Sequence, residues 1–362
     1  MPGVVAMAAT DGGTLYEGAF GSRDLANGPA MTRDSVFRIA SMTKAVTSVA
    51  AMQLDEPIGG LLPELASPAV LEGFDATGAP RLRPAKRPIT PKHLLTHTAG
   101  FGYEIWNPEL ICYVEVTGVP TFLSGKLEAL RMPLAFDLGE RWEYGISIDW
   151  VGRAVETASG QPLDAYFREH IFAPLGMTDT GFVPSANQAA RLVRVHRRGP
   201  DGSLEAITFE RSQGEFFSGG GGLLSTSPDY LAFLRMLLHQ GRFNGAPVLR
   251  PETVALIAQD QIGDLELGGM KTAMPELSND VDLFPSIRCG HGLANVINKQ
   301  PGPNGRSAGT MTWAGLFNRY YWIDPQKRVT GVILTQILPF ADDRAVRLYG
   351  EFERGVYDAL QN

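Results

Sequence analysis

A serine and a lysine three residues apart, Ser41 and Lys44, form the first pair of side chains that could carry out chemistry. Helix formers follow them and predict a helix to about Leu54, and residues three apart share one helix face. A serine hydroxyl is a weak nucleophile until a base removes its proton, and a lysine whose pKa is lowered by burial can be that base. The helix N-terminus adds backbone N–H groups that favour a developing oxyanion. The pair predicts acyl transfer onto Ser41, although a capping serine beside a solvated lysine has the same spacing.

Two further stretches could complete such a site. Tyr144 lies just before a predicted helix, where a neighbouring cation would lower the pKa of its hydroxyl and make it a usable base. A packing residue with its hydroxyl in water is the alternative. Near the C-terminus, a strand-like run contains Trp313-Ala314-Gly315. Gly315 would let a substrate or another backbone come close, and the N–H of Leu316 could donate to an oxyanion.

Other motifs also resemble catalytic ones and are expected to be structural. The run 305–309 matches the Gly-x-Ser-x-Gly turn of α/β-hydrolases through Ser307, but a turn precedes it and a strand follows. Lys271-Thr272-Ala273 is a near match to Lys-Thr-Gly in a loop bounded by Gly and Pro, and the four glycines at 219–222 read as a tight bend. We expect His97 to be a structural hydrogen-bonding residue and His291 to line the cleft.

The composition excludes several kinds of partner. Of 362 residues, 20% are charged and the net charge is −7, which argues against nucleic acid, since phosphate binding needs clustered Lys and Arg. The basic cluster at 191–198 is expected to be a solvated face. Cys112 and Cys289 read as reduced thiols of an intracellular protein. No apolar run reaches the roughly 20 residues of a membrane span, and no signal peptide is visible, so we expect a cytoplasmic protein. No His, Cys and Asp spacing resembles a metal site, so neither metal nor cofactor is expected.

The pattern of elements predicts an α+β fold. We expect an antiparallel sheet built from both termini and flanked by helices, with a mostly helical lobe inserted between them and the active site between the two. The sheet lobe would comprise residues 1–54 and 286–362, and the helical lobe residues 55–285. The composition of 61–91 indicates a loop with little helix, and the stretch 101–131 has few clear periods. The expected elements are a hairpin over 4–10 and 14–20, helices over 41–54, 90–96, 148–158, 163–172, 227–240 and 342–360, and strands over 309–316, 319–323 and 329–337.

Four blocks in this order resemble the serine β-lactamase and penicillin-binding-protein superfamily, closest to the class C β-lactamase-like carboxylesterases called family VIII esterases. They are Ser41-Met42-Thr43-Lys44, Leu94 to Gly100, Tyr144-Gly145-Ile146 and Trp313-Ala314-Gly315. The resemblance covers essentially the whole chain. It implies Ser41 as nucleophile, Lys44 and Tyr144 as base and acid, and the N–H groups of Ser41 and Leu316 as oxyanion donors. It also implies that Trp313, Gly315, Ile146 and His291 contact the substrate.

Three departures from that family matter. Trp313 stands where its β-lactamases carry the lysine of Lys-Thr-Gly, which helps to hold a substrate carboxylate, so neutral esters are favoured. Ile146 replaces the asparagine of Tyr-x-Asn. The helix after Lys44 is several residues short before Asp55.

Three functions follow as hypotheses. The first is a serine carboxylesterase that hydrolyses short-chain or aryl esters through an acyl-enzyme on Ser41, with a small-molecule ester as its partner. The second is a β-lactamase, a D-amino-peptide or amide hydrolase, or an acyltransferase that uses the same site. The third is a penicillin-binding-like sensor whose acylation is a dead end, against which the intact Ser41, Lys44 and Tyr144 speak. The oligomeric state is left open.

Overall fold

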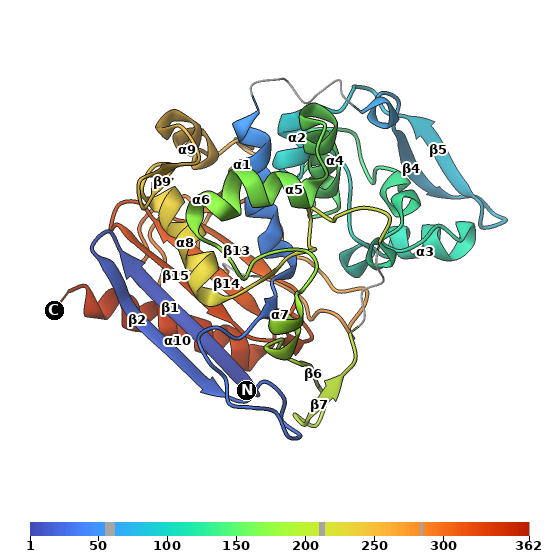
Figure 1. Ribbon diagram of the computed structural model, residues 1–362. Helices are drawn as coiled ribbons and strands as arrows, with labels where there is room; N and C mark the ends of the chain where they lie inside the picture. The colour runs from blue at the N-terminus through green and yellow to red at the C-terminus, as the bar shows by residue number, and fades with distance from the viewer. Residues whose placement is uncertain (55–61, 210–213, 283–284, 362) are drawn as a thin grey trace.

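A seven-stranded antiparallel sheet joins the two ends of the chain (Figure 1). The computed structural model describes residues 1–54, 62–209, 214–282 and 285–361. The strand order is β11-β12-β13-β14-β15-β1-β2, so the C-terminal strand β15 pairs with the N-terminal strand β1. The strands are β1 (Gly3–Thr10), β2 (Gly13–Gly21), β11 (Cys289–His291), β12 (Val296–Asn298), β13 (Met311–Gly315), β14 (Arg319–Asp324) and β15 (Val329–Leu334).

Both faces of this sheet are covered, as the side chains that alternate between the two faces along β1 show. Val5 and Met7 belong to the main apolar core, which they share with helices α1 (Thr43–Gln53) and α8 (Ser227–Leu238). Ala8 instead packs with the C-terminal helix α10 (Asp343–Ala359), which lies across the opposite face (Figure 1). Successive residues of a strand point to opposite faces, so one short strand contributes to both cores.

Helices and small hairpins fill the middle of the chain and lie on one side of the sheet (Figure 1). The helices are α2 (Pro91–Leu95), α3 (Pro108–Thr117), α4 (Ser147–Ser159), α5 (Leu163–Phe167), a π-helical turn (Arg168–Phe172), α6 (Ala173–Leu175), α7 (Ala186–Ala190) and α9 (Pro251–Ile257). The strands are β3 (Phe37–Arg38), β4 (Ala69–Phe74), β5 (Pro80–Pro84), β6 (Val195–Arg198), β7 (Leu204–Ile207), β8 (Leu224–Ser225), β9 (Arg242–Phe243), β10 (Ala246–Pro247) and β16 (Ile337–Leu338).

The predicted sheet of both termini is confirmed, including the N-terminal hairpin and the three C-terminal strands. The expectation of a plain loop over 61–91 was wrong, because β4 and β5 form a hairpin there. Its turn is fixed by Asp75, whose side chain accepts hydrogen bonds from the N–H groups of Thr77 and Ala79 at 2.8 and 3.0 Å. Helix α1 ends at Gln53, and the predicted short junction at Asp55 lies outside the described residues.

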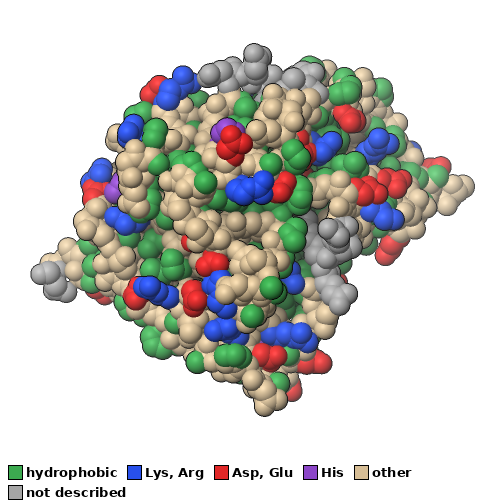
Figure 2. All heavy atoms as spheres, viewed as in Figure 1, with side chains coloured by type: hydrophobic (Ala, Val, Ile, Leu, Met, Phe, Trp, Pro, Cys, Tyr) green, Lys and Arg blue, Asp and Glu red, His purple; other side chains and the backbone are tan. Residues whose placement is uncertain are grey.

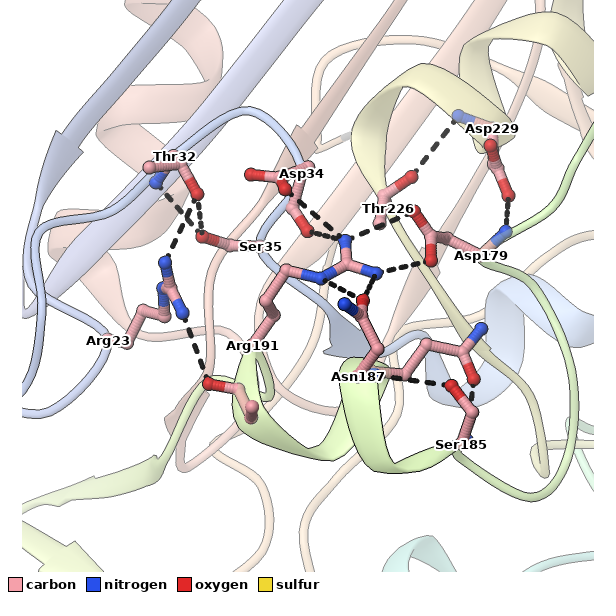
Figure 3. Close-up of polar contacts among 12 residues, drawn as sticks. Arg23, Thr32, Asp34, Ser35, Asp179, Ser185, Asn187, Arg191, Thr226 and Asp229 are labelled. Carbon is pink, nitrogen blue, oxygen red and sulfur yellow. Dashed lines mark hydrogen bonds and ion pairs between the residues drawn. The ribbon is translucent and has the colours of Figure 1, made fainter.

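Basic and acidic side chains are interspersed over the face drawn in Figure 2. Arg191, the first residue of the basic cluster, is largely buried and structural rather than solvated (Figure 3). Its guanidinium donates to the Asp34 carbonyl at 2.6 Å, to Asn187 at 2.7 Å and to Asp179 at 3.1 Å. These contacts join the chain before β3 to α7. No helix in the described ranges is both long and apolar enough to cross a membrane.

Asp229, in the first turn of α8, gives the fold a dependence on pH (Figure 3). Burial raises the pKa of its carboxyl from 3.8 to about 6. The folded state therefore holds this proton more tightly than the unfolded state. The stabilisation by protonation is fully present below pH of about 4 and is lost as the pH rises to about 6.

We therefore expect Asp229→Asn to remove this pH dependence of the stability. The hydrogen bonds from the Asp179 N–H and the Thr180 hydroxyl both reach Oδ2, so one amide oxygen can accept both. Between pH 4.5 and pH 7.5, urea unfolding should show the wild type losing about 2 kcal/mol of unfolding free energy relative to the variant. Parallel pH profiles for the two proteins would contradict the assignment.

Candidate active site

Ser41 lies in a 3-10 turn, Ala40–Met42, that leads directly into α1. The turn is constrained on both sides. Ala40 has a φ of +45°, which is uncommon for a residue with a side chain. The N–H of Ile39 donates to the carbonyl of Leu223 at 2.9 Å. A Cβ at Gly315 would lie 2.6 Å from the Ile39 carbonyl oxygen, so only glycine lets the end of β13 lie against this turn.

Lys44 is fully buried one turn after Ser41. Its Nζ lies 3.3 Å from Ser41 Oγ, 3.1 Å from the Tyr103 hydroxyl and 2.6 Å from the Gly220 carbonyl oxygen. The carbonyl can only accept, so it takes one N–H in either protonation state of the lysine. A neutral Lys44 can therefore keep this bond and turn its lone pair toward Ser41 Oγ.

The four-glycine run supplies that carbonyl. The N–H of Gly220 and the hydroxyl of Ser218 both donate to Asp149 Oδ1 on α4, at 3.0 and 2.6 Å. The hydroxyl of Thr47 on α1 donates to the Gly219 carbonyl at 2.7 Å. A Cβ on Gly220 would lie 2.4 Å from the Asp149 carboxylate, so the turn needs glycine there. The predicted tight bend thus fixes the acceptor for Lys44.

Tyr144 is buried beside the pair. Lys44 Nζ lies 4.7 Å from the centroid of its ring. The expected lowering of its pKa is not found, since burial raises the pKa of the hydroxyl above 10, and Ser41 and Trp313 beside it offset only part of the rise. Tyr144 is therefore held as a neutral phenol, suited to donating a proton, and it becomes a base only if a neighbouring group changes its charge.

The residues predicted to contact substrate lie around this centre but are nearly all buried. Ile146 packs in the main core, and His291 is fully buried against Trp142 and Trp313. Trp313 also forms one wall of a cavity of about 240 Å³. The cavity is lined by Trp142, Glu266, Leu267, Gly268, Met270, Val281, Asp282, Ile287, Arg288, Cys289, Val296 and Trp313.

The competing motifs lie elsewhere. The N–H of Ser307 donates to the Asp324 carboxylate at 2.8 Å and its carbonyl accepts from Asn298, so this serine belongs to a turn before β13. Lys271 is exposed and forms an ion pair with Asp280 at 2.7 Å. Both motifs are structural in position.

The thiols and possible metal ligands offer no second centre in the part of the chain that the structure describes. No group of three or more His, Cys, Asp and Glu side chains there could hold a metal ion. Cys112 and Cys289 are free thiols, and burial raises the pKa of Cys289 to about 11.

Two groups of the site were missed by sequence reasoning. Tyr103 and Gly220 contact Lys44 from 59 and 176 residues away. Tyr103 follows the Leu94 to Gly100 block closely, and the glycine run by itself predicts only a tight bend. No spacing rule links either of them to Lys44.

Comparison with known proteins places the chain in a family. The family model described as beta-lactamase matches residues 1–355. The chain is 32% identical to monacolin J acid methylbutanoyltransferase of Aspergillus terreus, over 100% of this chain and 92% of that protein. It is 31% identical to lovastatin esterase of Penicillium rubens, over 98% of this chain and 93% of that protein.

Solved structures agree on the fold. Unliganded simvastatin synthase from Aspergillus terreus superposes with a TM-score of 0.85 at 32% identity, over 99% of this chain and 94% of that chain. EstCE1, a hydrolase with promiscuous acyltransferase activity, superposes with a TM-score of 0.73 at 23% identity, over 100% of this chain and 94% of that chain. The predicted α+β fold of the β-lactamase and transpeptidase type is confirmed.

The position of the two serines gives a direct test. Ser41→Ala should lower kcat for a p-nitrophenyl ester by at least about 10³-fold, because it removes the serine hydroxyl that lies 3.3 Å from Lys44 Nζ. Ser307→Ala should leave kcat within about twofold and serves as the matched control. An inactive, folded Ser307 variant beside an active Ser41 variant would refute the placement of the site.

Proposed function

Because this chain belongs to the beta-lactamase family, we propose that it hydrolyses carboxylic esters through an acyl-enzyme on Ser41. The observation that carries this proposal is the 3.3 Å approach of a fully buried Lys44 amine to Ser41 Oγ, beside the phenol of Tyr144. Ester-acting serine chemistry is shared with the relatives of this fold. The acyl acceptor and the roles of individual residues are our proposal.

In the acylation step, Ser41 Oγ attacks the ester carbonyl carbon and its proton passes to neutral Lys44. A new Oγ–C bond forms, and the carbonyl oxygen becomes an oxyanion. The backbone N–H groups of Ser41 and Leu316 would hold that oxyanion, since Gly315 brings the end of β13 against the nucleophile turn. The C–O bond to the leaving alcohol then breaks, and the alkoxide takes a proton from Tyr144 or Lys44.

Deacylation reverses these steps with a second hydroxyl compound. Neutral Lys44 removes a proton from water as the water oxygen attacks the acyl carbon, and Lys44 returns that proton to Ser41 Oγ as the Oγ–C bond breaks and the carboxylic acid leaves. An alcohol in place of water gives a new ester with the same balance of atoms. This makes acyl transfer to an alcohol the second candidate function, and it is supported by the names of the similar proteins, which include both acyltransferases and an esterase.

Hydrolysis of β-lactams is the weakest of the alternatives. Trp313 stands on β13 where the related β-lactamases carry a lysine. A β-lactam carboxylate would lack that charge-assisted hydrogen bond, which is worth about 1.5–3 kcal/mol. A neutral ester has no carboxylate, so it loses no hydrogen bond when tryptophan replaces the lysine.

The partition of the acyl-enzyme tests the proposal. Incubation with p-nitrophenyl butyrate and rising concentrations of an apolar primary alcohol should leave kcat/KM for p-nitrophenol release unchanged, because acylation precedes the acceptor. The ratio of butyrate ester to butyric acid should rise with the alcohol, and mass spectrometry should find the butyryl group on the peptide that contains Ser41. Absence of the adduct, or turnover of a chromogenic cephalosporin at the rate of the best ester, would overturn the proposal.

Substitution of the two tyrosines near Lys44 should lower kcat/KM to different extents. Lys44→Ala and Tyr144→Phe should each lower kcat/KM for the p-nitrophenyl ester by about 10³-fold, and together by little more, because residues that act as a unit are not additive. Tyr103→Phe should cost about tenfold or less, since the Gly220 carbonyl still holds Lys44. If the Lys44 and Tyr144 losses multiply, the two residues act independently. If Tyr103→Phe lowers kcat/KM as much as Tyr144→Phe does, the assignment of the proton transfer to Tyr144 is wrong.

A further inference from the structure

His97 occupies an unusual position directly after α2. Its φ is +55°, and its side chain is 1% exposed. Its ring lies edge-on to Tyr144, with the ring centroids 4.9 Å apart and the planes at 65°. It also contacts Trp142, His291 and Trp313. None of the proposed chemical steps uses this imidazole.

Two hydrogen bonds connect His97 to the residues on either side of Tyr144. The N–H of Glu143 donates to the His97 carbonyl oxygen at 3.0 Å, and the N–H of Gly145 donates to its Nδ1 at 3.4 Å. The opposite side of this segment is closed, because a Cβ on Gly145 would lie 2.2 Å from the Phe101 carbonyl oxygen. The backbone that carries Tyr144 therefore lies between Phe101 and His97.

The tautomer of His97 follows from these contacts. Nδ1 accepts a hydrogen bond, so the proton of the neutral ring is on Nε2. Burial, His291 and Lys44 all lower the pKa of His97 well below 6.5, in that order of effect, so the ring stays neutral. His291 takes the other tautomer, since its Nδ1 lies 2.7 Å from the Gly292 carbonyl oxygen and must donate to it.

We propose that His97 is a positioning residue for Tyr144, which it holds toward Ser41 and Lys44 by the paired hydrogen bonds to Glu143 and Gly145 and by the contact of its ring. This inference rests on the proposed function, in which Tyr144 handles the proton of Ser41. His97 itself touches neither substrate nor the reacting atoms. The acceptor at Nδ1 is the group that does the positioning.

The position constrains which residues can replace it. Asparagine, like histidine, is enriched at positive φ, and its Oδ1 lies near the place of the Nδ1 acceptor. Glutamine carries its amide one bond further out, near the place of Nε2, and a leucine has no acceptor. His97→Asn should therefore preserve the contact with Gly145, whereas His97→Gln and His97→Leu should lose it.

The rate at which a fluorophosphonate probe labels Ser41 measures this without assuming a natural substrate. We expect His97→Gln and His97→Leu to be labelled about 100-fold more slowly than wild type, because a displacement of about 1 Å costs that much. His97→Asn should stay within about fivefold. For a p-nitrophenyl ester, the loss should fall on kcat with KM little changed. His93→Gln, in the preceding helix α2 and partly exposed, is the control and should label as wild type does.

Each outcome decides the inference. Equal labelling of His97→Gln and wild type would refute it, as would a His97→Asn variant that is folded and as slow as His97→Gln. If His97→Leu does not fold by circular dichroism, the Asn and Gln pair still decides. If wild-type Ser41 is not labelled at all while the protein is folded, the proposed function fails first, and the positioning role falls with it.

Discussion

The complete burial of Lys44 is the constraint on which the site depends. A lysine amine without solvent needs protein acceptors, because an unsatisfied buried polar group is costly. Here three different segments supply oxygens: the turn that carries Ser41, the chain after α2, and the glycine turn before β8. These segments meet only when the sheet and the helices have packed, so the site exists only in the complete fold. The same burial disfavours the charged amine, which favours its action as a base.

Close backbone approach is the second requirement, and glycine meets it in two places. Gly315 brings the end of β13 against the turn that carries Ser41, and Gly220 lies against the carboxylate of Asp149. At each place a methyl group would be less than 3 Å from a fixed atom. Gly315 thus joins the sheet, built from both termini, to the turn that carries Ser41 by a contact that no larger residue permits.

The sequence could predict the parts of the site that depend on local periodicity. The spacing of Ser41 and Lys44 follows from the helix repeat, and the hairpin over β1 and β2 follows from alternation and a turn. The contacts of Lys44 with Tyr103 and Gly220 could not be predicted, because tertiary packing alone brings them together across 59 and 176 residues. The raised pKa of Tyr144 could not be predicted for the same reason, since burial is its main cause and cannot be read from a motif.

Trp313 changes the electrostatic character of the site as well as its shape. With Trp142, Tyr144, His97 and His291 it forms a cluster of aromatic rings around the proposed proton donor. His291 stays neutral, because burial lowers its pKa to about 4, and His97 stays neutral for the same cause. Among these five rings none carries a charge at neutral pH, so the surroundings of Lys44 on this side have low polarity. A lysine in place of Trp313 would add a cation here and favour anionic substrates. The aromatic cluster instead suits neutral esters, in which the oxyanion formed during acylation is the only negative charge that the site must stabilise.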